Sequence, residues 1–135
     1  MRAVILAAGV ALLASQAQAQ TVSLTAYLLG KYAVPATKSD AFGEGQFTYD
    51  SATGNLTYYL SYDGTAPNKI DLHGPAASGT GGPALLTFPV TASPVTGTAT
   101  LTKAQADSLL AGTVYVDMHS PAYPDGEIRG QIRKE

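Results

Sequence analysis

Hydrophobic and polar residues alternate along most of this chain, which is the pattern of β-strands that bury one face. Every second residue from Val22 to Leu28 is apolar, and the residues between them are serine, threonine and tyrosine. Residues 55–63 show the same period of two most clearly. Neighbouring side chains on a strand point to opposite faces, so this period predicts half-buried strands. The predicted strands are residues 21–28, 43–49, 55–63, 69–73, 84–90, 113–119 and 126–133.

One segment departs from the period of two. Thr102 and Gln105 have the spacing of a capping box, in which each side chain bonds the backbone amide of the other residue. Leu109 and Leu110 follow, and Gly112 is typical of the position just beyond a helix end. This segment therefore predicts one short helix at about residues 103–111.

Glycine and proline residues mark the connections between the predicted strands. Gly54 supplies the positive φ that a hairpin loop often requires. Residues 74–83 form a glycine-rich loop, and residues 91–97 are predicted to be irregular. Seven to eight short strands with such turns predict an all-β fold, either a β-sandwich or a barrel. The pattern indicates no second domain.

The first nineteen residues have the features of a secretory signal peptide. Arg2 gives a basic start, residues 3–13 are uncharged and mostly apolar, and Ala17 and Ala19 supply the small residues that signal peptidase accepts. We expect cleavage after Ala19, which leaves residues 20–135 as one domain. The expected location is therefore the periplasm or the outside of the cell.

Composition narrows the classes of partner. The chain has eight lysine and arginine residues against ten aspartate and glutamate residues, a formal net charge of −2, and no basic run. Such a charge balance argues against binding to nucleic acid or to anionic lipid. After the first nineteen residues no stretch is long and apolar enough for membrane insertion. The chain has no cysteine, so packing rather than disulfides must stabilise the domain.

Five segments, in this order, resemble the CHRD (chordin-type) domain family. They are LTAYLLGKYAVPATKSDAFGEGQFTYD, GNLTYYLSYDG, KIDLHGPAASGTGGP, LTKAQADSLLAG and YVDMHSPAYPDGEIRGQI. The last segment is the most specific of the five. The resemblance implies an all-β extracellular module with an immunoglobulin-like, Greek-key antiparallel β-sandwich.

The resemblance implies little chemistry. In chordin such modules accompany growth-factor-binding domains, and bacterial members are mostly exported proteins of unassigned activity. Family members tend to carry His-x-His in the central strand, where this chain has Asp71 before His73. They usually have Asn and Thr where this chain has Asp117 and Ser120.

The first candidate for chemistry is a metal site. Asp71 and His73 are two positions apart on one predicted strand, so their side chains share a face. Tyr115, Asp117 and His119 share a face of another strand by the same rule. If the two strands are neighbours, two imidazoles and one or two carboxylates converge, a ligand set that suits zinc or copper.

Two interpretations of this cluster stay open. In the first, His73 and His119 form hydrogen bonds across strands or to loop carbonyls and hold the glycine-rich loop in place. In the second, the cluster binds a metal, and the chain handles copper or zinc or has a superoxide-dismutase-like redox role. The redox version is the weaker one, because two histidines cannot build a histidine-rich copper centre.

A second candidate is the closing strand. Glu127 and Arg129 share one face of it, and we expect them to form a structural polar network with Tyr115. Arg129 is expected to pair with Asp117 or Glu127, whereas an exposed and unpaired Arg129 would indicate recognition of an anion.

The sequence carries no catalytic motif. It has neither a Gly-x-Ser-x-Gly sequence nor a cysteine, and the glycine-rich loop lacks the ending of a phosphate-binding loop. We therefore predict an exported, non-catalytic binding or structural module that acts on an unidentified protein or small ligand. The alternative is a metalloprotein that uses Asp71, His73, Asp117 and His119.

Overall fold

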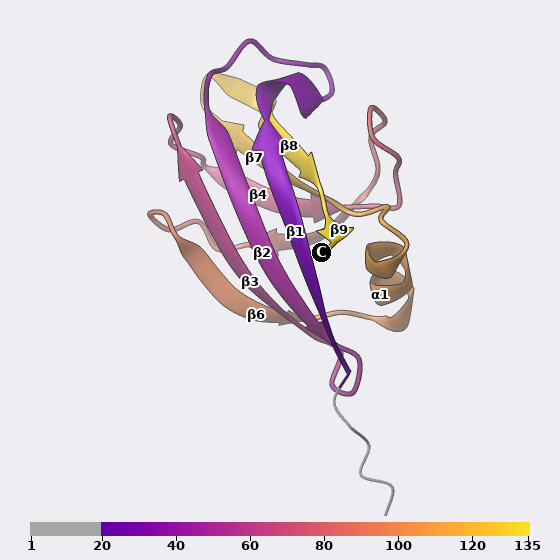
Figure 1. Cartoon of the computed structure of the whole chain (residues 1–135). Coiled ribbons are helices and arrows are strands. Elements are labelled where there is room, and N and C mark those ends of the chain that lie inside the picture. The colour runs from indigo at the N-terminus through magenta and orange to yellow at the C-terminus, as the bar shows by residue number, and fades with distance from the viewer. Residues whose placement is uncertain (1–19) are drawn as a thin grey trace, which may run out of the picture.

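The computed structural model describes residues 20–135, so the predicted signal peptide lies outside the described residues. The regular secondary structure of this part of the chain is almost entirely β-strand (Figure 1). The strands are β1 (Thr21–Leu29), β2 (Phe42–Asp50), β3 (Asn55–Asp63), β4 (Lys69–His73), β5 (Ala84–Phe88), β6 (Val95–Thr100), β7 (Tyr115–Ser120), β8 (Tyr123–Gln131) and β9 (Arg133–Lys134). One 3₁₀ turn, η1 (Gly30–Tyr32), follows β1, and one helix, α1 (Lys103–Leu110), precedes β7. The all-β prediction with one short helix is confirmed.

All nine strands belong to one antiparallel sheet in the order β5-β4-β7-β8-β1-β2-β3-β6, with β9 paired to β1. The sheet curls, so that β1, β2, β3 and β6 lie in front of β4, β7 and β8 in Figure 1. The two halves are therefore layered like a sandwich but joined at one side, where Leu29 pairs with Arg129. Gly130 permits this approach, because a Cβ at that position would collide with the carbonyl oxygen of Tyr27.

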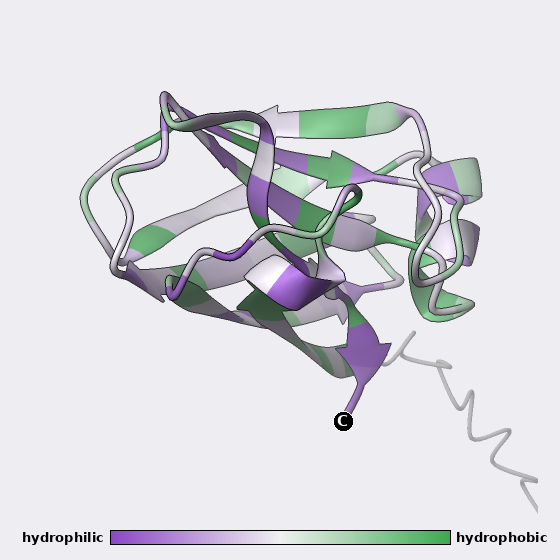
Figure 2. Ribbon diagram, turned by 90° about the horizontal axis from the view of Figure 1, so that it is seen from above, coloured by the Kyte–Doolittle hydropathy of each residue, from purple (hydrophilic) through white to green (hydrophobic). Residues whose placement is uncertain are grey.

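The hydrophobic core fills the space between the two halves. It takes alternate residues from the strands, which is why hydrophobic and hydrophilic positions alternate along the ribbons in Figure 2. Tyr58 of β3 stacks on Phe88 of β5 with ring centroids 4.0 Å apart, which links one half to the other. Ala106 and Leu109 of α1 are buried in the same core. Packing of these apolar faces is what stabilises a domain that has no disulfide.

Local signals in the sequence were reliable. The capping box is present, with Thr102 Oγ1 accepting from the Gln105 amide at 3.2 Å and Gln105 Oε1 accepting from the Thr102 amide at 2.9 Å. Gly54 has the positive φ expected at the hairpin, +77°. No helix within residues 20–135 is long and apolar enough to cross a membrane.

The main difference from the predicted elements is β6, which lies partly in the segment that we expected to be irregular. Val95 is its one buried residue, and the positions that alternate with threonine are Gly97 and Ala99. A Cβ at Gly97 would collide with the hydroxyl of Tyr58. A side chain is therefore excluded at position 97, and with the small Ala99 as the next inward residue the period of two is hard to see in the sequence of this strand.

Candidate metal centre

The polar residues singled out in the sequence lie on the outer face of β4, β7 and β8. In the register of these strands, Asp71 is opposite Asp117, Asp117 is opposite Arg129, and His73 is opposite Tyr115. The period of two thus places these side chains on one face. The intervening residues of the same strands are buried in the core: Ile70, Leu72, Val116, Met118 and Ile128.

Four of these side chains, which we call the His–Asp cluster, come together: Asp71, His73, Asp117 and His119. Oδ2 of Asp71 lies 3.4 Å from Nε2 of His73 and 3.8 Å from Nε2 of His119. These three atoms all lie within 4.8 Å of one another. Oδ2 of Asp117 lies 3.4 Å from Nε2 of His119 on the other side. One ion could therefore contact both imidazoles.

Backbone carbonyls fix the orientation of both imidazole rings. Nδ1 of His73 lies 3.0 Å from the carbonyl oxygen of Gly82, and Nδ1 of His119 lies 2.9 Å from that of Pro124. A carbonyl oxygen can only accept, so each Nδ1 must carry the proton of the bond. In the neutral ring, Nε2 is then a bare lone pair, and in both residues it is directed at Asp71.

The glycine-rich loop is held to the cluster by the same contacts. Gly82 accepts from His73 through its carbonyl and donates its amide to the hydroxyl of Tyr115 at 3.1 Å. The rings of His73 and Tyr115 stack at 5.0 Å with an angle of 4° between their planes. The histidines therefore do bond loop carbonyls, as one of our two interpretations expected, but they use only Nδ1 to do so.

Asp71 is fully buried. Its Oδ1 accepts a hydrogen bond of 2.9 Å from Thr87 of the edge strand β5. Among residues 20–135 its Oδ2 has no hydrogen-bond partner, and neither has Nε2 of His73 or of His119, although all three atoms are buried. The ammonium of Lys69, a half-exposed side chain, lies 3.3 Å from Oδ2. Buried polar atoms without partners are costly, so three of them directed at one point require an explanation.

Asp117 completes the cluster at its more exposed side. Burial raises the pKa of the Asp117 carboxyl above its ordinary value, and the nearby His119 and His73 offset part of that rise. Gly126 packs against this carboxyl: a Cβ there would lie 2.8 Å from Oδ1, and its φ is +120°. The position thus favours glycine both for its backbone conformation and for the space that Asp117 occupies.

The arrangement matches what a first-row divalent metal requires. Metal–nitrogen and metal–oxygen bonds of about 2.0–2.2 Å in a tetrahedron put neighbouring ligand atoms roughly 3.3–3.6 Å apart. The contacts of Asp71 Oδ2 with the two imidazoles, 3.4 and 3.8 Å, are close to that range. One ion could bridge Asp71, His73 and His119, while Asp117 contacts His119 at 3.4 Å beside this group of three. Histidines that ligate metals almost always donate their other ring N–H to a carbonyl or carboxylate, as His73 and His119 do here.

Arg129 does not form the ion pair that we expected. Within residues 20–135 it pairs with neither Asp117 nor Glu127, so this prediction was wrong. Its guanidinium instead lies over the ring of Tyr115, 3.5 Å from the centroid. Nη2 donates to the carbonyl of Ala77 at 3.2 Å and to Oε1 of Gln131 at 3.3 Å. Burial lowers the pKa of this guanidinium from its ordinary value.

Glu127 belongs to a different network. Its carboxylate accepts hydrogen bonds from the hydroxyl of Ser39, at 2.9 Å, and from that of Thr65. Its backbone carbonyl accepts from Thr37 at 2.8 Å. Glu127 therefore anchors two connections, 37–39 and 65, to the middle of β8. Arg129 and Tyr115 thus belong to one polar network and Glu127 to a second one, whereas we expected all three residues in a single network.

Sequence reasoning missed the partners that orient the cluster. The carbonyls of Gly82 and Pro124 have no sequence signature, since any residue offers a carbonyl. Thr87 lies in the predicted strand 84–90, but the sequence pattern does not show which strands are neighbours of residues 69–73. The glycine and proline residues around Gly82, and the proline residues at 121 and 124, were the one available signal that the backbone turns near these carbonyls.

A family model described as the CHRD domain matches residues 24–132. The chain belongs to the CHRD domain family. The matched range includes the whole His–Asp cluster and all strands from β2 to β8. Membership of the CHRD family supports a non-catalytic binding or structural module. No curated protein and no solved structure gave a significant match to the chain.

Proposed function

We propose that this CHRD domain is an exported, non-catalytic binding module that holds one divalent transition-metal ion, zinc or copper, at the His–Asp cluster. The observation that carries the proposal is the set of three buried atoms without hydrogen-bond partners: Oδ2 of Asp71 and Nε2 of both histidines. A metal ion between them supplies the missing partner of all three. The predicted signal peptide supports the export part of the proposal.

A network of protonated histidines is the competing explanation. In it, each Nε2–H would donate to a carboxylate of Asp71 or Asp117. Charge-assisted N–H···O bonds have lengths of about 2.7–2.9 Å, whereas the observed contacts are 3.4 to 3.8 Å. These distances are too long for such bonds and suit two ligands of one ion. The geometry therefore favours the metal.

Lys69 can compensate the carboxylate of Asp71 but not the two imidazole nitrogens of the cluster. Its ammonium is 3.3 Å from Oδ2 of Asp71 and supplies a positive charge to that carboxylate when no metal is bound. It forms no hydrogen bond with either imidazole among the described residues, so both Nε2 atoms still lack a partner. Since this side chain is 55% exposed, its ammonium can move into water when an ion binds.

The donor set selects among metals. Two imidazole nitrogens and the carboxylate of Asp71, with the carboxylate of Asp117 nearby and no sulfur, suit zinc and copper(II) better than copper(I). Two carboxylates also neutralise a divalent ion, which matters where Asp71 is fully buried. A zinc site of this kind would tie β4 to β7, and through the histidines it would hold the loop that carries Gly82 and the start of β8 at Pro124. This stabilising and binding role agrees with a non-catalytic family.

The test is a calorimetric titration of the purified, chelator-treated chain with zinc and with copper(II). We expect one site per chain, and we expect His73→Ala and His119→Ala to weaken zinc binding at least a hundredfold, since each removes one of few ligands. Asp63→Asn, which neutralises an exposed carboxylate away from the cluster, is the matched control and should bind like the wild type. Circular dichroism shows that each variant is folded. Equal zinc affinity in the wild type and the folded histidine variants would overturn the proposal.

A further inference from the structure

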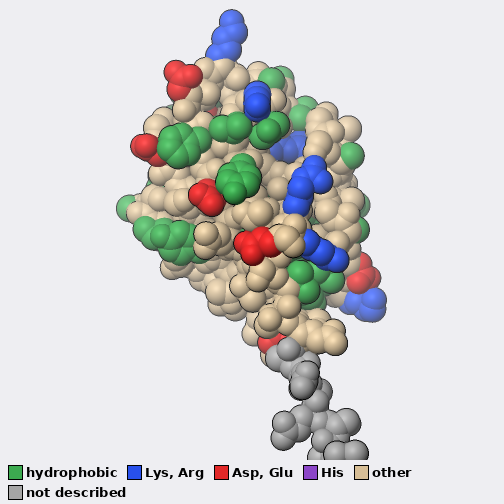
Figure 3. All heavy atoms as spheres, in the orientation of Figure 1, with side chains coloured by type: hydrophobic (Ala, Val, Ile, Leu, Met, Phe, Trp, Pro, Cys, Tyr) green, Lys and Arg blue, Asp and Glu red, His purple; other side chains and the backbone are tan. Residues whose placement is uncertain are grey.

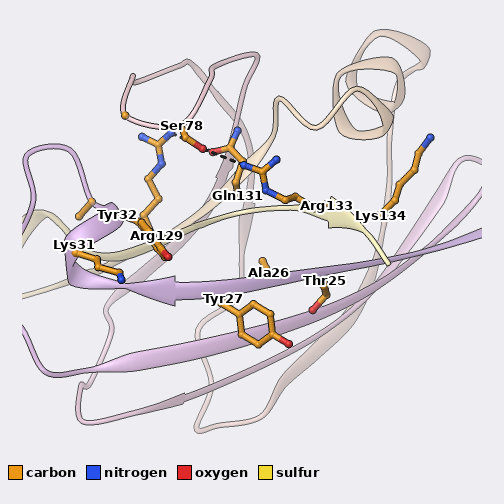
Figure 4. A pocket seen from close by; sticks show the side chains of 12 residues that line it. Thr25, Ala26, Tyr27, Lys31, Tyr32, Ser78, Arg129, Gln131, Arg133 and Lys134 are labelled. Carbon is orange, nitrogen blue, oxygen red and sulfur yellow. Dashed lines mark hydrogen bonds between the residues drawn. The ribbon is translucent and has the colours of Figure 1, made fainter.

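A second site lies on the other side of Tyr115, in a pocket between β1, η1, the end of β8, β9 and the glycine-rich loop (Figure 4). Its volume is about 690 Å³, which is within the usual range for small-molecule sites, roughly 300–1,000 Å³. Four cationic side chains line it: Lys31, Arg129, Arg133 and Lys134. We call it the cationic pocket.

The charge of this pocket is unusual for the chain as a whole. Four of the eight lysine and arginine residues line it, in a chain whose formal net charge is −2. No aspartate or glutamate is among its lining residues, and none of the four cations forms an ion pair within residues 20–135. In Figure 3 the lysine and arginine side chains lie mainly along one side of the visible face. Clustered cations without counter-charges favour an anion from solution.

Arg129 makes this more than a surface patch, because it is only 2% exposed. Both of its hydrogen bonds come from Nη2, and within the described part of the chain Nε and Nη1 donate none. A guanidinium has five N–H donors in a fixed fork that suits carboxylate and phosphate groups. A largely desolvated cation without an ion-pair partner is costly. The nearby Asp117 offsets part of this effect on the pKa of Arg129, and a bound anion would reduce the cost further.

The wall of the pocket is already in place. Nε2 of Gln131 donates to the carbonyl of Ala76 at 2.8 Å, and Nη2 of Arg133 donates to the hydroxyl of Ser78 at 3.3 Å. In Figure 4 these side chains reach from the C-terminal segment to the loop that carries Ser78. With the loop held in this way, a ligand would not have to order it on binding.

The remaining lining residues favour an organic ligand. Tyr27 and Tyr32 line the pocket and are 61% and 47% exposed. Exposed aromatic rings beside cations offer apolar contact area to a carbon skeleton, while the hydroxyls of Thr25 and Ser78 offer hydrogen bonds. A bare inorganic ion would leave most of the volume and both rings unused.

We propose that the cationic pocket binds a small organic anion that carries carboxylate or phosphate groups. The proposal does not depend on a metal in the His–Asp cluster. Arg129, at the floor of the pocket, recognises the anionic group; Lys31 and Arg133 at the rim add long-range attraction; Tyr27 and Tyr32 contact the carbon skeleton.

Chemical-shift mapping on the ¹⁵N-labelled chain tests this directly. The probes are glucose 6-phosphate, glutarate and inorganic phosphate at matched ionic strength; glutarate chelates metals only weakly, so the cluster does not confuse the result. We expect saturable shifts at residues 25–33, 76–79 and 129–134 with one of the organic probes. We also expect that probe to bind at least fivefold more tightly than inorganic phosphate. Preference for glucose 6-phosphate or for glutarate identifies the head group.

Variants separate a built site from general attraction. The double variant Lys31→Gln/Arg133→Gln removes two exposed cations, so it should fold normally and bind the preferred probe about tenfold more weakly. Lys38→Gln, an exposed lysine outside the pocket, should change the affinity less than twofold. Absence of saturable shifts, equal binding of inorganic phosphate, or equal losses in the double variant and in Lys38→Gln would each overturn the proposal.

Discussion

Replacing Asp71 by asparagine distinguishes a metal site from an ionic network by the sign of its effect on stability. The carbonyl oxygen of asparagine can keep the bond from Thr87 Oγ1, which now goes to Oδ1 at 2.9 Å. The amide nitrogen then takes the place of Oδ2, facing the two Nε2 atoms at 3.4 and 3.8 Å. In the metal-free protein, the amide N–H groups of Asp71→Asn can therefore donate to the Nε2 lone pairs of His73 and His119, which have no donor in the wild type.

The expected magnitude follows from these contacts. Each hydrogen bond gained contributes about 0.5–1.5 kcal/mol. The contacts of 3.4 and 3.8 Å must first shorten to about 3.2 Å, which requires side-chain movements of roughly 0.2 and 0.6 Å. The lost pair with Lys69, a half-exposed side chain, costs about 0–1 kcal/mol. We therefore expect metal-free Asp71→Asn to be as stable as the wild type or up to about 2 kcal/mol more stable. If the histidines were instead protonated partners of Asp71, the same change would break a buried ion pair and destabilise the fold by about 3–5 kcal/mol.

The assay is urea unfolding followed by circular dichroism, with chelator and with zinc. Zinc at about one hundred times its dissociation constant should stabilise the wild type by roughly 2.7 kcal/mol. Zinc should stabilise Asp71→Asn much less, since a carboxylate ligand is gone. A loss of 3 kcal/mol or more in chelator, together with no effect of zinc on the wild type, would refute the reasoning.

Three further predictions concern the same structure. Lys69→Met removes the ammonium 3.3 Å from Oδ2 of Asp71 and should tighten zinc binding by up to about fivefold; an unchanged or weaker affinity in calorimetry would contradict this. Gly126→Ala combines a φ of +120° with a Cβ 2.8 Å from Oδ1 of Asp117, so it should cost about 1–3 kcal/mol in urea unfolding and also weaken zinc binding. Thr102→Ala removes the cap of α1 and should cost about 1 kcal/mol with unchanged zinc affinity; altered zinc binding there would mean that the cluster senses remote changes.

Much of the fold was predictable because its strands carry a strong period of two. The bounds of β3 and β4 agree with the prediction, and the capping box located α1. The strand β6 was not predictable in the same way, since its inward positions include Gly97 and Ala99 rather than large apolar residues. Its place beside β3 depends on the ring of Tyr58, which only the three-dimensional structure brings against Gly97.

The candidate site was likewise predictable in part. The period of two alone predicted that His73 shares a strand face with Asp71 and that His119 shares one with Asp117. It could not show that β4 and β7 are adjacent. The pairing of Arg129 was wrong because the carboxylate of Asp117 packs against Gly126 and lies near His119, although the two residues are opposite in register. The cationic pocket was not foreseen, because it combines residues from both ends of the domain.

The metal content of the chain as it is purified, without added metal or chelator, tests the central claim most directly. Inductively coupled plasma mass spectrometry of the wild type should find about one zinc or copper ion per chain. The same measurement on folded His73→Ala and His119→Ala should find little of either metal. A wild-type chain that carries neither metal, and that still takes up neither after incubation with zinc or copper, would contradict the assignment of the His–Asp cluster as a metal centre.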